Sequence, residues 1–291
     1  MELLRPLSPV VPVFLLIAIG FVFASWKKIS LASITEIIVY LAAPCLVFTA
    51  LATRPLHATD ISLLLCGAVG ILAGTGILVW IYFSVFQFHS RGFALPVLFM
   101  NAGNMGIPLA LFAFGQPGLQ RGTLMFVIVS VFQYSLGIYI LGGRGNWREI
   151  FRLPLIYATS LGLLFNMGQI KIPEVIFQPL SMLGYSTIPL MLVSLGYRLH
   201  DVRSLRWGHS LGGALLRIIG GFFAAYLTAT IIGAEGVNRQ LILLYGALPS
   251  AVVNFVLTEK YGQDPELAAS IVVLSTFFSV LTIPLVFWLI L

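Results

Sequence analysis

Long apolar runs follow one another along this chain, with only short polar connections between them. A helix of roughly 20 apolar residues crosses the hydrocarbon core of a bilayer, which is about 30 Å thick. Of the 291 residues, 59% are hydrophobic and only 9% are charged, whereas about a quarter of an ordinary soluble domain is charged. A soluble fold would lack the polar surface to cover so much apolar material. The sequence therefore predicts a polytopic membrane protein.

The apolar runs predict an all-α fold with ten membrane-spanning helices. Their expected bounds are 9–26, 33–53, 61–86, 93–114, 119–141, 153–170, 174–198, 208–232, 238–258 and 266–290. The connections are short, so we expect no separate soluble domain. The first apolar run lacks a small-residue cleavage site, and we expect it to remain as the first helix.

Lysine and arginine are distributed unevenly over the connections between these helices. Five lie on the side of the N-terminus: Arg5, Arg54, Arg121, Lys171 and Arg239. Ten lie on the other side: Lys27, Lys28, Arg91, Arg144, Arg148, Arg152, Arg198, Arg203, Arg206 and Lys260. Because positively charged loops stay in the cytoplasm, we expect both termini to face away from it. Orientation thus explains the net charge of +6, and no nucleic-acid partner is expected.

Prolines recur at nearly constant spacing in the two halves of the chain. The offset from Pro44 to Pro189 is 145 positions, and the offset from Pro108 to Pro249 is 141. Five helices per half is an odd number, so the second half enters the membrane from the opposite side. This pattern predicts an inverted-topology repeat, which is typical of secondary transporters. The two predicted halves are residues 1–142 and 143–291.

Two of the predicted helices contain residues that interrupt a helix near its middle. The first has Asn101, Gly103, Asn104, Gly106 and Pro108, and the second has Pro249, Ser250 and Asn254. Proline removes a backbone N–H and glycine weakens a helix, and lipid cannot satisfy the backbone groups that are freed. Half-helix N-termini and asparagine amides donate N–H groups that suit a carboxylate. We therefore expect a substrate-binding site where the two breaks cross; alternatively, neighbouring helices fill each break as a kink.

Other polar residues within the apolar runs are candidates for the border of this site. Ser130 and Gln133 share one helical face, as do Thr276 and Ser279 at the matching place in the second half. Such residues equally serve to tie helices together in membranes. Arg217 is a strong charge deep in a predicted span. It either snorkels to the cytoplasmic surface, or attracts an anion or joins a polar network.

Several functional classes lack the residues that their chemistry needs. The four histidines fall in or beside predicted loops, and no paired carboxylates, Ser–His pair or metal-ligand set lies within the spans. We therefore expect no enzyme and no cofactor. The phosphate-binding pattern G-x-x-x-x-G-K-[ST] does not occur, which argues against ATP-driven transport by this chain alone. Neither break contains Asp or Glu. This argues against a carboxylate-based proton relay there, although a coupling proton or sodium ion stays possible, and a sodium site would depend on carbonyl and hydroxyl groups.

Three stretches of sequence resemble the auxin efflux carrier family, which looks related to the bile acid:sodium symporters. They are NAGNMGIPL at 101–109, PLSMLGYSTIPLMLVSLGYRL at 179–199 and ALPSAVVNFVLTEKYGQDPELAASIVVLSTFFSVLTIPL at 247–285. The resemblance covers essentially the whole chain. It implies a scaffold of predicted helices 1, 2, 6 and 7, and a transport domain of helices 3–5 and 8–10 that moves like an elevator. It also implies a homodimer through the scaffold.

The resemblance also implies roles for individual residues. By position, Asn101 matches the crossover asparagine near the substrate carboxylate, and Pro108 and Pro249 match the crossing prolines. Asn254 departs from the plant carriers, which tend to have a second proline there, and the long loop of those carriers is absent. Both departures resemble prokaryotic members, which lie in the bacterial inner membrane. The implied function is secondary transport of a small organic anion, such as malonate or malate rather than auxin; the alternative is a sodium-coupled symporter of the bile-acid type.

Overall fold

The structure, a computed structural model, describes residues 6–53, 55–142, 151, 153–201 and 205–291. In this part of the chain the regular elements are helices, apart from one isolated β-bridge. Six helical stretches are long and apolar enough to cross a membrane: Leu31–Ala52, Ala58–Phe86, Ala102–Ile140, Glu174–His200, His209–Ile231 and Pro265–Ile290. Two shorter apolar helices, Val10–Trp26 and Pro154–Met167, accompany them. The chain is a polytopic membrane protein, as its composition predicts.

The bounds of the helices lie close to those of the predicted apolar segments. In the labels, α marks an α-helix and η a π-helical turn. The first half contains α1 (Val10–Trp26), α2 (Leu31–Ile37), η2 (Ile38–Ala42), α3 (Ala43–Ala52), α4 (Ala58–Phe86), α5 (Arg91–Leu98), η3 (Ala102–Gly106), α6 (Ile107–Phe132), η4 (Gln133–Gly137) and α7 (Ile138–Ile140). The second contains α9 (Pro154–Met167), α10 (Glu174–Asp201), α11 (His209–Leu215), η5 (Leu216–Gly220), α12 (Gly221–Ile231), α13 (Gly236–Ala247), α14 (Val252–Lys260) and α15 (Pro265–Ile290). Outside the described residues lie the start of the second predicted half, at 143, and six of the arginines counted above: Arg5, Arg54, Arg144, Arg148, Arg152 and Arg203.

The helix α6 changes direction at Gly115. The backbone of Gly115 has φ 63° and ψ −147°, a conformation that glycine adopts without the steric cost of a Cβ. Pro117 follows two residues later and suits the first turn of a helix, where its missing N–H is not needed. The chain therefore turns between the predicted segments 93–114 and 119–141, although no loop separates them.

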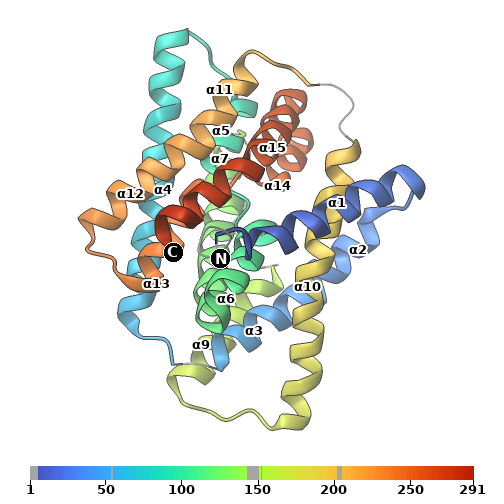
Figure 1. The fold of residues 1–291 in the computed structure, drawn as a ribbon, viewed down its shortest axis with the longest axis vertical. Coiled ribbons are helices and arrows are strands. Elements are labelled where there is room, and N and C mark those ends of the chain that lie inside the picture. The colour runs from blue at the N-terminus through green and yellow to red at the C-terminus, as the bar shows by residue number, and fades with distance from the viewer. Residues whose placement is uncertain (1–5, 54, 143–150, 152, 202–204) are drawn as a thin grey trace.

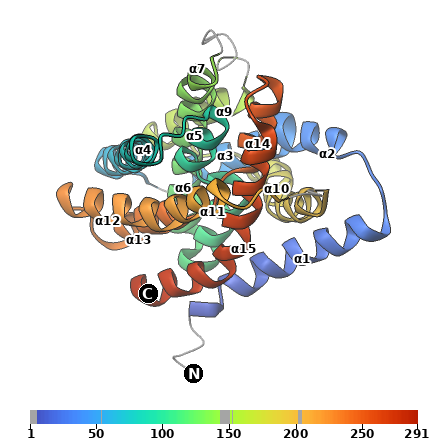
Figure 2. The same cartoon turned by 90° about the horizontal axis from the view of Figure 1, so that it is seen from above.

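The helices pack in two groups that share the central helix α6 (Figures 1 and 2). α1 runs along α10, and α3 packs against α9 and α10; in Figure 1, α1, α2 and α10 lie on the right. α4, α5 and α11–α15 pack on one another, and α6 contacts both groups. Glycines allow the closest approach in the first group: a Cβ on Gly20 would overlap the carbonyl of Val193, and one on Gly196 would overlap that of Ile17.

Large apolar side chains cover the outer faces of the helices. Trp80, Phe223 and Leu285, on three different helices, have 69%, 63% and 62% of their surface exposed. Many similar side chains accompany them, far more than the isolated apolar residues on the surface of a soluble monomer. These faces are suited to contact with lipid.

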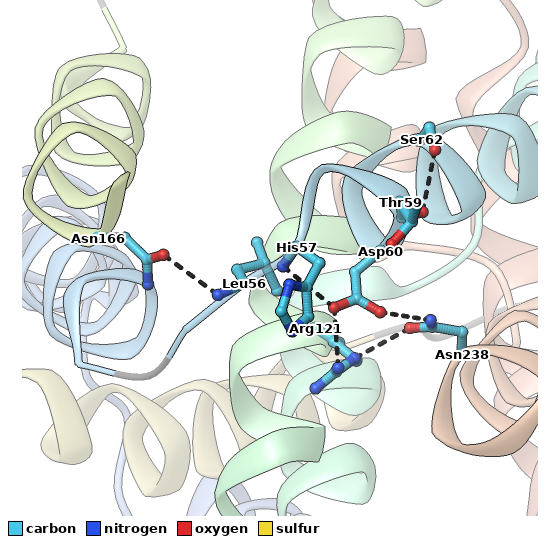
Figure 3. A network of polar contacts seen from close by, with 8 residues as sticks. All are labelled: Leu56, His57, Thr59, Asp60, Ser62, Arg121, Asn166 and Asn238. Carbon is cyan, nitrogen blue, oxygen red and sulfur yellow. Dashed lines mark hydrogen bonds and ion pairs between the residues drawn. The ribbon is translucent and has the colours of Figure 1, made fainter. Parts of the chain in front are cut away.

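A polar network fastens α4, α6 and α13 to one another (Figure 3). Asp60 on α4 accepts hydrogen bonds from Arg121 on α6 at 3.0 Å and from Asn238 on α13 at 2.6 Å. Arg121 Nε also donates to Asn238 Oδ1 at 2.9 Å. Nearby, the backbone N–H of Leu56 donates to Asn166 of α9 at 3.1 Å, which attaches the connection before α4 to the first helix group. The charge of Asp60 is thus paired within the helix packing.

Candidate functional site

Two helical stretches in the core are interrupted by short non-helical segments. α5 ends at Leu98, and the chain leaves the helical conformation over 99–101 before η3 leads into α6. α13 ends at Ala247, and α14 begins only at Val252. The second interruption follows from Pro249, because the residue before a proline avoids the helical conformation. Leu248 accordingly has φ −63° and ψ 145°.

The two interruptions pair with each other through their backbones. Met100 and Ser250 form an antiparallel β-bridge. The N–H of Asn101 donates to the carbonyl of Pro249 at 2.8 Å, and the N–H of Ala251 donates to that of Phe99 at 3.1 Å. These bonds satisfy groups that helix breaking frees and lipid cannot serve. The two segments, about 150 positions apart in sequence, therefore form one structural unit.

A cavity of about 310 Å³ adjoins the paired segments. Five of the predicted site residues line it: Asn101, Gly103, Asn104, Ser130 and Gln133. Other polar side chains in its wall are Thr35, Tyr134, Ser194 and Arg198. The wall also includes 102–104 and 251–253, where the helices that follow the two breaks begin. Helix N-termini carry partial positive charge, so the backbone contributes to an anion-attracting interior.

The side chain of Asn101 has a hydrogen-bond donor without a partner. Only 3% of the residue is exposed, and its amide Nδ2 makes no hydrogen bond. Its backbone carbonyl accepts from Gly106 at 3.1 Å, and its backbone N–H is paired as described above. A buried donor left without an acceptor costs about 1–3 kcal/mol.

Arg198 is a charged lining residue, although its place at the end of a predicted span indicated only a loop charge. It lies on α10, and its Nη2 donates to Thr35 Oγ1 on α2 at 3.1 Å. Among the described residues that line the cavity, none is Asp or Glu. The signal that could have identified Arg198 is its position nine residues after Pro189, within a largely apolar helix. The described part of the cavity wall therefore carries a cation and no carboxylate.

Asn254 lies behind the cavity wall and has its side-chain groups paired. It is fully buried. Its Nδ2 donates to the Phe99 carbonyl at 2.8 Å and to Ser250 Oγ at 3.0 Å, and its Oδ1 accepts from Gln133 Nε2 at 2.7 Å. Asn254 thus binds the two breaks to each other. The N–H of Ser250 donates to Ser275 Oγ at 3.1 Å, which adds α15 to this unit.

The remaining predicted site residues are buried near the breaks but do not line the cavity. They are Gly106, Pro108, Pro249 and Ser250 in the breaks, and Thr276 with Ser279 on α15. A Cβ on Gly106 would come within 2.7 Å of the ring of Tyr245, so this glycine permits close packing. Thr276 and Ser279 donate to carbonyls of their own helix at 2.7 and 2.6 Å.

The structure contradicts the interpretation that Arg217 snorkels to the membrane surface. Arg217 lies in the π-helical turn η5 and is 0% exposed. Its Nη1 donates to the carbonyls of Val97 and Leu98 at 2.8 and 2.9 Å, and its Nη2 donates to that of Gly246 at 2.9 Å. It does not line the cavity. The other interpretation, membership of a polar network, fits this geometry, because buried carbonyls hold the side chain inside.

Interrupted helices that meet beside a cavity within a polytopic membrane protein define the class of membrane transporters. A family described as membrane transport protein matches residues 7–146 and 143–287. The chain belongs to this family, that of the auxin efflux carriers, and is a transporter and not an enzyme.

Individual relatives agree with this membership. An uncharacterized transporter of Methanocaldococcus jannaschii is 27% identical, covering 98% of this chain and 99% of the relative. An uncharacterized transporter of Methanothermobacter thermautotrophicus is 28% identical over 87% of each chain. A probable auxin efflux carrier component 1b of rice, Oryza sativa subsp. japonica, is 25% identical over 50% of this chain and 27% of the carrier.

Proposed function

We propose that this transporter is a secondary carrier for a small organic anion, a mono- or dicarboxylate, which binds in the cavity beside the paired breaks. The observation that carries the proposal is the composition of the cavity wall. It combines the amide group of Asn101, whose Nδ2 has no hydrogen-bond partner, with the guanidinium of Arg198, and none of the described lining residues is Asp or Glu. A carboxylate oxygen accepts hydrogen bonds from both kinds of donor, and charge-assisted bonds are the stronger ones.

The size and the apolar part of the cavity support a small substrate. A volume of about 310 Å³ is at the lower end of ligand sites. Ile38, Val39 and Phe126 line it beside the polar groups, so hydrocarbon and carboxylate portions of one molecule both find matching surroundings. A small carboxylate such as malonate or malate fits within this volume.

We further propose ten membrane spans in two inverted repeats and an elevator movement between two helix groups. The scaffold would comprise α1–α3, α9 and α10, and the moving part α4–α7 and α11–α15. The donors divide between them: Arg198 and Thr35 belong to the scaffold, whereas Asn101, Asn104 and Gln133 belong to the moving part. The network of Asp60, Arg121 and Asn238 supports movement of the second group as a unit. We also propose that the protein forms a homodimer through the scaffold. It would lie in the bacterial inner membrane with both termini facing away from the cytoplasm.

The proposal is tested by uptake of radiolabelled carboxylates into proteoliposomes that contain the purified protein. We expect uptake of at least one small mono- or dicarboxylate, competed by unlabelled anions and not by the corresponding amides. A matched pair of variants tests the charge: Arg198→Gln lowers uptake, whereas Arg239→Gln, which removes a partly exposed arginine near Tyr226, leaves it unchanged. Equal competition by amides and carboxylates would contradict the proposal.

A further inference from the structure

The side chain of Arg217 joins the C-terminal ends of the two half-helices that precede the breaks. α5 ends with Val97 and Leu98, and Gly246 precedes the last residue of α13. The final carbonyls of a helix have no partner within it. The hydrogen bonds of 2.8–2.9 Å from one guanidinium therefore satisfy carbonyls of both half-helices at once.

The charge of Arg217 is balanced by backbone dipoles. The ion pairs among the described residues join Arg121 to Asp60 and Arg206 to Asp264, and neither includes Arg217. A fully buried cation without compensation is costly in a membrane. Each helix C-terminus carries roughly half a negative elementary charge, so two such ends amount to roughly one. The two half-helices together thus compensate a single positive charge.

Two glycines beside the guanidinium of Arg217 make the space for these hydrogen bonds. A Cβ on Gly221, one turn after Arg217, would overlap Nη2 of the arginine. A Cβ on Gly246 would overlap the carbonyl of Gly221 and the side chain of Ala225 on α12. Glycine at both positions therefore lets α12 and α13 approach closely enough for the guanidinium to reach the Gly246 carbonyl.

In transporters with discontinuous helices, the C-terminal ends of half-helices and unwound carbonyls are also what coordinates a coupling sodium ion. We propose that Arg217 is a fixed internal cation that occupies this position between α5 and α13, so that sodium does not bind there. Arg217 is a positioning residue, because it acts on the substrate cavity only through the half-helices. The consequence for ion coupling rests on the transport function proposed above; the positioning role does not.

The test is thermal unfolding of the purified protein in sodium chloride and in choline chloride at equal ionic strength. We expect the wild-type Tm to be the same in both salts. Arg217→Ala removes the donors and the charge, and we expect its Tm to fall by about 10 °C in choline. Sodium then raises the Tm of Arg217→Ala, because the vacated carbonyls accept a small cation. Arg239→Ala serves as the control, with an unchanged Tm in both salts.

Two outcomes would overturn the inference: a sodium-specific rise in the wild-type Tm, or an Arg217→Ala variant as stable as wild type in choline. If Arg217→Ala does not fold, Arg217→Lys keeps a cation and tests the same point. Its Tm should lie below that of wild type and should not respond to sodium; a response to sodium would contradict the inference. These measurements need no substrate, so failure of every carboxylate in the uptake assay would remove the proposed function without changing them.

Discussion

The two sides of the crossing differ in how their helix ends are satisfied. On one side, the helices that begin after the breaks open into a cavity, where the Asn101 amide has no partner. On the other side, the helices that end before the breaks meet the guanidinium of Arg217, which is fully buried. The same interruption thus produces a positive end left open for a ligand and a negative end closed by the protein. Under the proposed function, holding the two breaks together and binding the substrate are tasks of separate residues.

The largest loss of stability should follow from disturbing the closed side, where Arg217 meets the helix ends. We expect Gly221→Ala to lower the free energy of unfolding by about 3 kcal/mol, because its Cβ overlaps the Arg217 guanidinium. Gly76→Ala is the matched control, since a Cβ there comes no closer than 3.8 Å to Leu98. Size-exclusion chromatography of samples heated to increasing temperatures monitors the unfolding of both variants and measures the difference in their stability. Equal stability of the two variants would show that the closed side tolerates extra volume.

On the open side, replacing Asn101 should lower transport activity and leave stability unchanged or higher. We expect Asn101→Ala to reduce uptake about 10- to 100-fold, because a hydrogen bond to a charged group contributes about 1.5–3 kcal/mol. Its Tm should equal or exceed that of wild type, since a buried donor without a partner is removed. Asn254→Ala is the contrasting variant: it breaks three hydrogen bonds and should lower the Tm. A fall in Tm for Asn101→Ala as large as that for Asn254→Ala would show that Asn101 supports the helix packing and is not held ready for a ligand.

A smaller effect is expected for the charge in the cavity wall. Arg198→Gln should raise the half-saturating concentration of a carboxylate about tenfold, as expected for a charge-assisted bond replaced by a neutral one. Arg198→Lys keeps the charge and should lie between this variant and wild type. Concentration-dependent uptake measures all three. An unchanged half-saturating concentration in Arg198→Gln would leave anion recognition to the helices of the proposed moving part.

The smallest effect is expected behind the wall. Thr276 donates only to the Val272 carbonyl of its own helix and does not line the cavity. Thr276→Val keeps the shape of the side chain, and we expect uptake within about twofold of wild type. A loss comparable to that of Asn101→Ala would return Thr276 to the border of the site.

Helix positions and breaks could be predicted from the sequence because their causes are local. Proline, glycine and asparagine clustered within a few residues weaken a helix locally, so Pro249 and the stretch from Asn101 to Pro108 were identifiable. A proline alone does not suffice, since α10 continues through Pro179 and Pro189. The direction of a polar side chain is set by distant neighbours. Apolar residues face both lipid and core in these helices, so periodicity does not reveal that Arg198 faces a cavity. For the same reason the sequence could not show that Arg217 reaches carbonyls about 120 positions away.

The backbone pairing of the two breaks imposes an order on biogenesis. The Phe99 carbonyl and the Asn101 N–H have no strand partner until Pro249 and Ala251 leave the ribosome. Until then the first break is a polar segment that the surrounding lipid cannot satisfy. The first half of the chain therefore enters the membrane with these backbone groups unpaired, and water or the insertion machinery must satisfy them until the second half is made.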